Sequence, residues 1–239
     1  MEPTARYEDV RIPLHEPGHE LESVSGVLGI PEWWPTGNRV AVCLAHAGTS
    51  DFEDPLLVYL QYELTARRFM TLRFNFPFAE AGKRWTADSA ETLDTAFRSA
   101  LAMLGRDPSA APAHLFIGGI GLGAKVACGM AAAPLRLDGL FFLNYPLHPQ
   151  DKPEEADTDD LYRITSPMLF VQGRRDRHCD ADTLRRALSR VGAPTRLHFV
   201  EEADASFKTT KRSGIEPRAV YRAVLESLAG WIDSRLDPA

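Results

Sequence analysis

The stretch "IGGIGLGAKVA", residues 117–127, decides the fold. The apolar run "HLFIGG" leads into it and ends at glycines, and a run of small residues, "LGAKVACGMAAA", follows at once. A buried strand, a tight turn and a small-residue helix form the junction at which many enzymes carry a nucleophile, in the pattern G-x-S-x-G. Here residues 119–123 read "GIGLG", so Gly121 occupies the serine position. The sequence therefore predicts an enzyme-like turn without the nucleophilic hydroxyl.

Outward from this turn, apolar runs alternate with amphipathic segments along the whole chain. The apolar runs show little polar alternation, which is typical of parallel strands buried on both faces, and the amphipathic segments have helical spacing. This order predicts an α/β fold with a central, mostly parallel sheet, helices on both faces and no large cap domain. Two earlier stretches, "DVRIPL" and "SVSGVLGIP", predict an antiparallel hairpin at one edge. The predicted strands are 39–48, 70–78, 114–120, 137–147, 167–173 and 195–200, and the predicted helices are 54–69, 89–104, 122–133, 180–192 and 216–236.

Composition limits the classes of protein to consider. The 239 residues are 44% hydrophobic and 25% charged, which fits one globular domain over residues 1–239. A net charge of −6 argues against binding to nucleic acid or to an anionic membrane, because both require a basic surface. No apolar run approaches a membrane span, and the N-terminus has no signal-peptide pattern. The three cysteines have neither metal-ligand spacing nor a disulfide framework, so we expect a cytoplasmic protein without a metal or cofactor.

Five ordered stretches carry a family resemblance: "AHAGTSDFEDPLL", "LRFNFPFAEAGKR", "NYPLHPQDKPE", "LFVQGRRD" and "SFKTTKRSG". They run from about residue 40 to the end of the chain. With them, the chain resembles an α/β-hydrolase of the dienelactone-hydrolase-like branch. That branch includes the third subunit of the NSL histone-acetyltransferase complex and a testis-expressed relative.

The resemblance implies where a Ser-Asp-His triad would lie. The nucleophile position is Gly121, the acid position is Asp176 at the end of "LFVQGRRD", and the histidine position is Ala205 in "DASF". Glycine has no hydroxyl to attack a carbonyl, and alanine cannot accept a proton. Because the acid acts only by orienting a histidine, Asp176 has no catalytic partner and is expected to accept hydrogen bonds from backbone amides of its own loop.

Other polar groups follow the predicted strands, where the ligand sites of such sheets lie. The resemblance places an oxyanion loop at "HAGT", with backbone from His46 and Ala47 acting together with the amide of Leu122. The side chain of His46 is expected to brace that loop, and Ser50 to help cap the next helix. The remaining predicted pocket residues are Asn75, Tyr145 and His148.

The function predicted from these losses is that of a pseudoenzyme with a degenerate triad, which binds a small carbonyl ligand or a protein partner. A second hypothesis is an active serine- or cysteine-type ester hydrolase with relocated groups. Its nucleophile would be Ser50, Cys179 or Ser206, and its base His148 or His178. A third, weaker hypothesis is dinucleotide binding, since Gly119, Gly121 and Ala124 match G-x-G-x-x-A. The strand after that motif ends in "FLNYPL" and supplies no carboxylate for a ribose.

Overall fold

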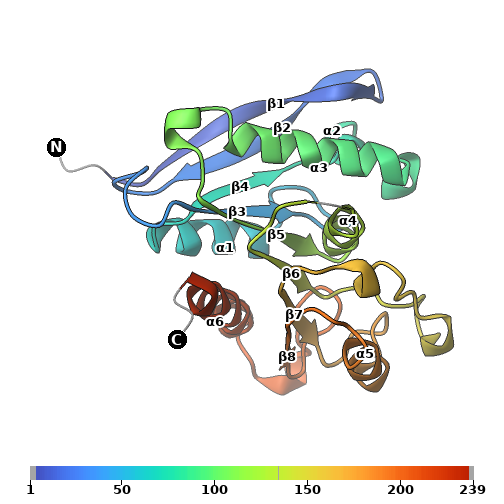
Figure 1. Cartoon of the computed structure of the whole chain (residues 1–239). Helices are drawn as coiled ribbons and strands as arrows, with labels where there is room; N and C mark the ends of the chain where they lie inside the picture. Colours follow the sequence, from blue (N-terminus) through green and yellow to red (C-terminus); the bar gives the residue numbers. More distant parts are fainter. Residues whose placement is uncertain (1–3, 134, 237–239) are drawn as a thin grey trace. The chain divides into compact units, whose positions relative to one another are not determined.

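The computed structural model describes residues 4–133 and 135–236, which divide into two compact units. The first unit runs to Gly119 and the second begins at Ile120. Each unit contains strands whose side chains are almost fully buried, flanked by helices (Figure 1). The prediction that residues 1–239 form a single domain stays a prediction.

The first unit has the strand order β1-β2-β4-β3-β5. Its strands are β1 (Arg6–Gly18), β2 (Leu21–Ile30), β3 (Val40–Ala45), β4 (Met70–Phe74) and β5 (His114–Ile120). Strand β2 pairs antiparallel with both β1 and β4, whereas β3 pairs parallel with β4 and β5. The predicted antiparallel hairpin at the edge is therefore confirmed, and it is longer than the two quoted stretches.

The α-helices of the first unit begin either at a capping side chain or at a proline. They are α1 (Pro55–Ala66), α2 (Pro77–Glu80) and α3 (Ala90–Leu104), with short 3-10 turns η1 (Trp85–Ala87) and η2 (Pro108–Ala110). Ser89 caps α3 by accepting from the Thr92 N–H, as its position predicts. The prediction for Ser50 was wrong, because Asp54 caps α1 through a bond from the Leu56 N–H. The strand predicted over 70–78 is shorter, because Pro77 starts a helix.

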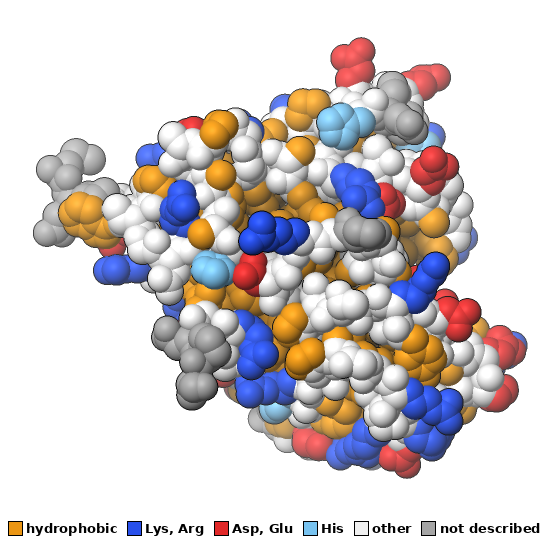
Figure 2. Space-filling model, in the orientation of Figure 1, with side chains coloured by type: hydrophobic (Ala, Val, Ile, Leu, Met, Phe, Trp, Pro, Cys, Tyr) orange, Lys and Arg blue, Asp and Glu red, His pale blue; other side chains and the backbone are white. Residues whose placement is uncertain are grey.

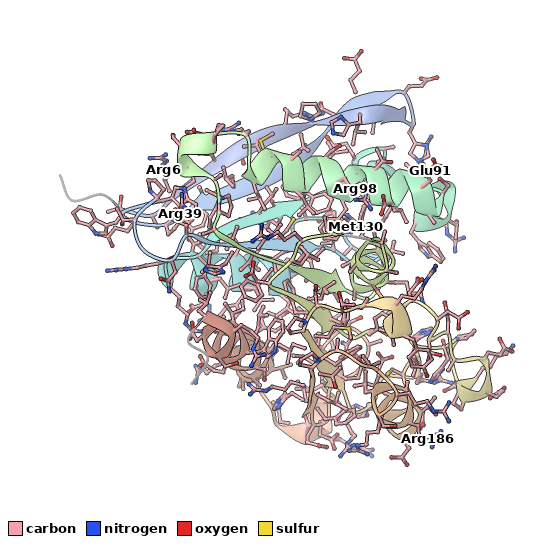
Figure 3. All side chains as sticks on the ribbon, in the orientation of Figure 1. Arg6, Arg39, Glu91, Arg98, Met130 and Arg186 are labelled. Atoms are coloured by element: carbon pink, nitrogen blue, oxygen red, sulfur yellow. The ribbon has the colours of Figure 1, made fainter. Side chains whose placement is uncertain are left out.

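Helix α3 lies along β1 in the first unit (Figure 1). Its outer face is charged, and Arg98, labelled in Figure 3, pairs with Asp94 one turn earlier at 2.6 Å. Helix α1 contacts β2, β3 and β4 through an apolar face. The buried members of that face are Leu56, Leu57, Leu60 and Leu64.

The second unit has the parallel strand order β6-β7-β8. The strands are β6 (Gly139–Leu143), β7 (Met168–Gly173) and β8 (Thr195–Val200), and the helices are α4 (Leu122–Ala131), α5 (Ala181–Leu188) and α6 (Pro217–Leu236). Short turns η3 (Pro153–Glu155), η4 (Leu161–Arg163) and η5 (Lys211–Ser213) connect them. Helices α5 and α6 lie on opposite sides of β7 and β8 (Figure 1).

Charged side chains of both signs cover the outside of α5. Figure 2 shows Lys and Arg side chains gathered there beside Asp and Glu side chains. Arg185 pairs with Asp182 at 2.9 Å, and Arg186, labelled in Figure 3, donates to the Thr183 hydroxyl.

Among helices of the described ranges, none is long and apolar enough to cross a membrane.

Candidate functional site

The turn between β5 and α4 keeps an unusual backbone conformation. Gly121 has φ 54° and ψ −107°, and it is the residue from which α4 starts. Its N–H donates to the carbonyl oxygen of Leu143, at the end of β6, over 2.9 Å. Side chains are strained at such a φ, whereas glycine adopts it at little cost. The turn is therefore sharp, and its central residue carries no side chain.

A single buried asparagine joins the strand ends next to this turn. Asn144 follows Leu143, has φ 52° and is 2% exposed. Its Oδ1 accepts from the N–H of Gly173 at 2.6 Å, and its Nδ2 donates to the carbonyl oxygen of Asp204 at 3.0 Å. One side chain thus links the ends of β6 and β7 to the loop after β8.

The carboxylate of Asp176 lies in this same region, three residues beyond Gly173. It is buried; its Oδ1 accepts from the N–H of His178 at 2.8 Å and its Oδ2 from Nε2 of Gln172 at 2.6 Å. Burial raises the pKa of Asp176 above the ordinary value for aspartate. The side chain of Gln172 also accepts from the N–H of Tyr145, at 2.9 Å. Of the backbone amides predicted to donate to Asp176 from its own loop, the structure shows that of His178.

The loop that carries Ala205 is held beside the Asp176 loop. The N–H of Arg175 donates to the carbonyl oxygen of Ala203 at 2.8 Å. Within the loop, Asp204 Oδ1 accepts from the N–H groups of Ser206 and Lys208, which fixes a tight turn around position 205. Ala205 is half-buried and contributes only a methyl group. Hydrogen bonds thus connect the backbone around positions 121, 176 and 205, and only Asp176 has a reactive group.

His148 uses both ring nitrogens to hold a loop. Its Nε2 accepts from the N–H of Asp180 at 2.7 Å, so Nδ1 carries the proton and donates to the carbonyl oxygen of Pro149 at 2.8 Å. Neither nitrogen is free to take a proton from a nucleophile. Cys179 is buried, and that burial raises the pKa of its thiol.

His46 repeats this arrangement in the first unit. Its Nε2 accepts from the N–H of Phe76 at 3.0 Å, and its Nδ1 donates to the carbonyl oxygen of Ala47 at 2.7 Å. The ring is fully buried, and burial lowers the pKa of His46 to about 4. Through these two bonds the side chain of His46 braces its loop, which is the role that the sequence predicts for it. The common role of His46 and His148 was not visible in the sequence, because their partners are backbone amides 30 and 32 residues away.

The three backbone positions predicted for an oxyanion are divided between the units: His46 and Ala47 belong to the first, and Leu122 belongs to the second. Ala47 follows β3 in the first unit, where its carbonyl oxygen also accepts from the N–H of Ser50 at 3.3 Å. Leu122 is the first residue of α4 in the second unit. Their joint role as oxyanion donors stays a prediction.

Asn75 belongs to a polar network that fixes the loop after β4. Its Oδ1 accepts from the N–H of Phe52, and its Nδ2 donates to Glu80, each at 2.9 Å. Glu80 also accepts from Arg11 and Ser25. Burial opposes ionisation of Glu80, but the hydrogen bonds from these three partners outweigh it and lower its pKa. The structure therefore gives Asn75 a positioning role between two loops.

The side chain of Tyr145 contacts two residues of helix α4, Lys125 and Cys128. Its buried hydroxyl accepts from Nζ of Lys125 at 3.2 Å and donates to the Cys128 sulfur at 3.4 Å. Lys125 also donates to Asp157 at 2.7 Å, which ties the acidic segment 154–160 to α4. Burial raises the pKa of Cys128 to about 12, so this thiol stays protonated at neutral pH.

An open cavity of about 420 Å³ lies within the first unit. It borders the loop after β3, helix α2 and the turn η1. The side chains of that turn were not predicted as site residues, and the only sequence signal for them is the string "KRW" shortly after a strand. The lining residues are Gly48, Thr49, Ser50, Asp51, Phe78, Ala79, Lys83, Arg84 and Trp85. In the described part of the chain, no three side chains come together as a metal site.

Gly119, the first glycine of the dinucleotide-like motif, has a packing explanation. A Cβ at this position would lie 2.3 Å from the carbonyl oxygen of Ala45 on β3. Glycine is therefore required where β5 passes close to β3, independently of any phosphate.

Comparison with protein families gives a match to an alpha/beta hydrolase domain over residues 38–233. Solved structures with the same fold include a dienelactone hydrolase from Anabaena variabilis. It is 18% identical, with a TM-score of 0.69 over 95% of this chain and 98% of that one. An alpha-beta serine hydrolase homologue from Coxiella burnetii is 16% identical, with a TM-score of 0.70 over 92% and 97%. A Xanthomonas campestris member of the serine hydrolases without a lid is 17% identical, with a TM-score of 0.68 over 94% and 95%.

Proposed function

Because this chain belongs to the alpha/beta hydrolase domain family, we propose that it is a pseudoenzyme, which keeps the fold but not triad hydrolysis. Instead of hydrolysing an ester, the protein binds a small carbonyl compound. The observation that carries the proposal is the pair Gly121 and Ala205, held by hydrogen-bonded backbone around an intact Asp176.

The chemistry of the triad explains why this pair matters. The serine oxygen attacks the carbonyl, the histidine takes and returns the proton, and the acid only orients the histidine and stabilises its charged form. Position 121 has no atom to form the acyl bond, and position 205 has no nitrogen to carry the proton. A substrate group could replace either the nucleophile or the proton carrier, but hydrolysis would still lack the other one.

The main alternative is a hydrolase whose nucleophile and base lie at other positions than 121 and 205. Two observations weigh against it. Its base would be His148 or His178, but both nitrogens of His148 are hydrogen-bonded to backbone groups. Its thiol nucleophile would be Cys179, which is buried with a raised pKa. Ser206 remains as the nucleophile that this alternative can still use, with His178 as its base, because the Oγ of Ser50 is inaccessible to solvent.

Small-molecule binding is favoured over a purely structural role by the cavity in the first unit. Its volume falls in the range of ligand sites, about 300–1,000 Å³. A protein partner is the second candidate, and it rests on the sequence resemblance to a subunit of a histone-acetyltransferase complex. The cytoplasm remains the compartment expected from the reduced cysteines.

Activity-based labelling separates the pseudoenzyme from the relocated hydrolase. The native chain is treated with a fluorophosphonate probe and, separately, with iodoacetamide, beside an active serine hydrolase as a positive control. The proposal predicts no stoichiometric labelling by either reagent until the chain is unfolded. Labelling of the native chain that disappears in Ser50→Ala, Ser206→Ala or Cys179→Ala would identify a relocated nucleophile and overturn the proposal.

A further inference from the structure

The cavity in the first unit has a positively charged wall in a chain of net charge −6. Lys83 and Arg84 line it together with one carboxylate, Asp51, so the lining carries a formal charge of +1. The guanidinium of Arg84 has no hydrogen bond or ion pair within the described residues. A guanidinium without a protein partner in a concave site favours an anionic ligand.

Lys83 is held in place from outside the cavity. Its Nζ donates to Nδ1 of His19 at 3.1 Å, and the other ring nitrogen of His19 contacts the buried carboxylate of Asp88. Asp88 also accepts from the N–H of Phe78, a residue of the cavity wall. The hairpin between β1 and β2 therefore orients the ammonium group, which keeps two N–H donors beyond the His19 bond.

A hydroxyl in the lining has no hydrogen-bond partner. The Oγ of Ser50 is inaccessible to solvent and unbonded within the described residues. Because solvent does not reach this atom, it does not face the open cavity, and the charged donors available to a ligand are those of Lys83 and Arg84. The adjacent Thr49 lines the same cavity.

An indole ring forms the apolar part of the wall. Trp85 packs on Gly48 so closely that a Cβ there would lie 3.0 Å from the ring atoms Cγ and Cδ1. The side chain is nevertheless 44% exposed, so part of the ring surface stays free. Phe78 and Ala79 add apolar surface to the same lining. A flat conjugated body would gain contact here that a compact ion would not.

We propose that this cavity binds an aromatic monocarboxylate. The planar fork of Arg84 and the ammonium of Lys83 receive the carboxylate, and the ring lies against Trp85. A net lining charge of +1, with Asp51 present, matches a monoanion better than a phosphate dianion. The inference rests on the proposed ligand-binding function and specifies its ligand class.

Isothermal titration of the full chain with three matched compounds tests this assignment. The compounds are 1-naphthoate, the neutral 1-naphthamide and 1-naphthyl phosphate. We expect 1-naphthoate to bind best, with the amide at least about tenfold weaker, the loss expected when a charge-assisted hydrogen bond is removed. Equal affinity for the amide, tighter binding of the phosphate, or no binding of any compound would overturn the inference.

Variants locate the binding and separate the two proposals. Arg84→Gln should weaken 1-naphthoate about tenfold, and Arg106→Gln, an exposed arginine outside the lining, should leave it unchanged. Asp51→Asn should strengthen it, because it removes the only carboxylate from the lining. An unchanged affinity in Arg84→Gln would overturn the site assignment. Turnover of 1-naphthyl acetate by the unmodified chain would overturn the proposed function alone, whereas an inert chain without naphthoate binding would overturn only this inference.

Discussion

Replacing Asn144 by alanine tests whether one side chain holds the strand ends next to Gly121, Asp176 and Ala205. The change removes an acceptor 2.6 Å from the N–H of Gly173 and a donor 3.0 Å from the carbonyl oxygen of Asp204. Each group left without a partner in this buried region costs about 1–3 kcal/mol. Alanine also tolerates the φ of 52° less well than asparagine, which adds about 1 kcal/mol. The expected loss of stability is about 4 kcal/mol.

Thermal unfolding followed by circular dichroism measures this loss. For a chain of this size 1 kcal/mol corresponds to about 2–4 °C, so the midpoint of Asn144→Ala should fall by about 8–16 °C. Asn144→Gly loses the same two bonds but relieves the backbone, and it should recover part of that decrease. The amide of Gly173 should lose its protection from hydrogen exchange in both variants. A midpoint within about 3 °C of the parent, with that amide still protected, would mean that the Asn144 side chain does not hold these strand ends.

Two further predictions concern a titratable group and a close backbone contact. Because burial lowers the pKa of His46 to about 4, the unfolded chain binds a proton at higher pH than the folded one, and stability should fall by about 3 kcal/mol as the pH drops from 6.5 to 4. His46→Gln should flatten that part of the pH profile in urea unfolding, and an equally steep profile would contradict the assignment. Gly119→Ala places a Cβ 2.3 Å from a carbonyl oxygen and should cost about 3 kcal/mol or prevent folding, whereas Gly192→Ala, whose Cβ meets nothing within 4 Å, should have little effect in the same assay.

The fold was predictable because its signals are local. Buried strands such as 114–120, the small-residue helix after Gly121 and the cap at Ser89 are specified by neighbouring residues, and the structure confirms them. The strand predicted over 70–78 was too long, because an apolar run does not distinguish a strand from the buried start of a helix at Pro77.

The site was predictable only in part, for the same physical reason. The sequence shows that position 121 has no hydroxyl and position 205 no imidazole. It does not show which amides a side chain reaches, and the bonds of Asn144 and His148 span about 30 residues or more. The cavity side chains Lys83 and Trp85 were missed because they follow helix α2 in an irregular segment without periodicity, and the family stretch that ends at Arg84 does not say which side chains line a cavity.

Hydrolysis of p-nitrophenyl acetate by the parent and by the double variant Gly121→Ser/Ala205→His shows whether the protein lacks triad chemistry. The parent should stay near the buffer rate, and the double variant should exceed it by at least about a hundredfold, the smallest usual contribution of a positioned acid–base group. Adding Asp176→Asn to the double variant should abolish the gain. Saturable hydrolysis by the parent that falls on Asp176→Asn would contradict the account, because it would mean that the protein is already an enzyme.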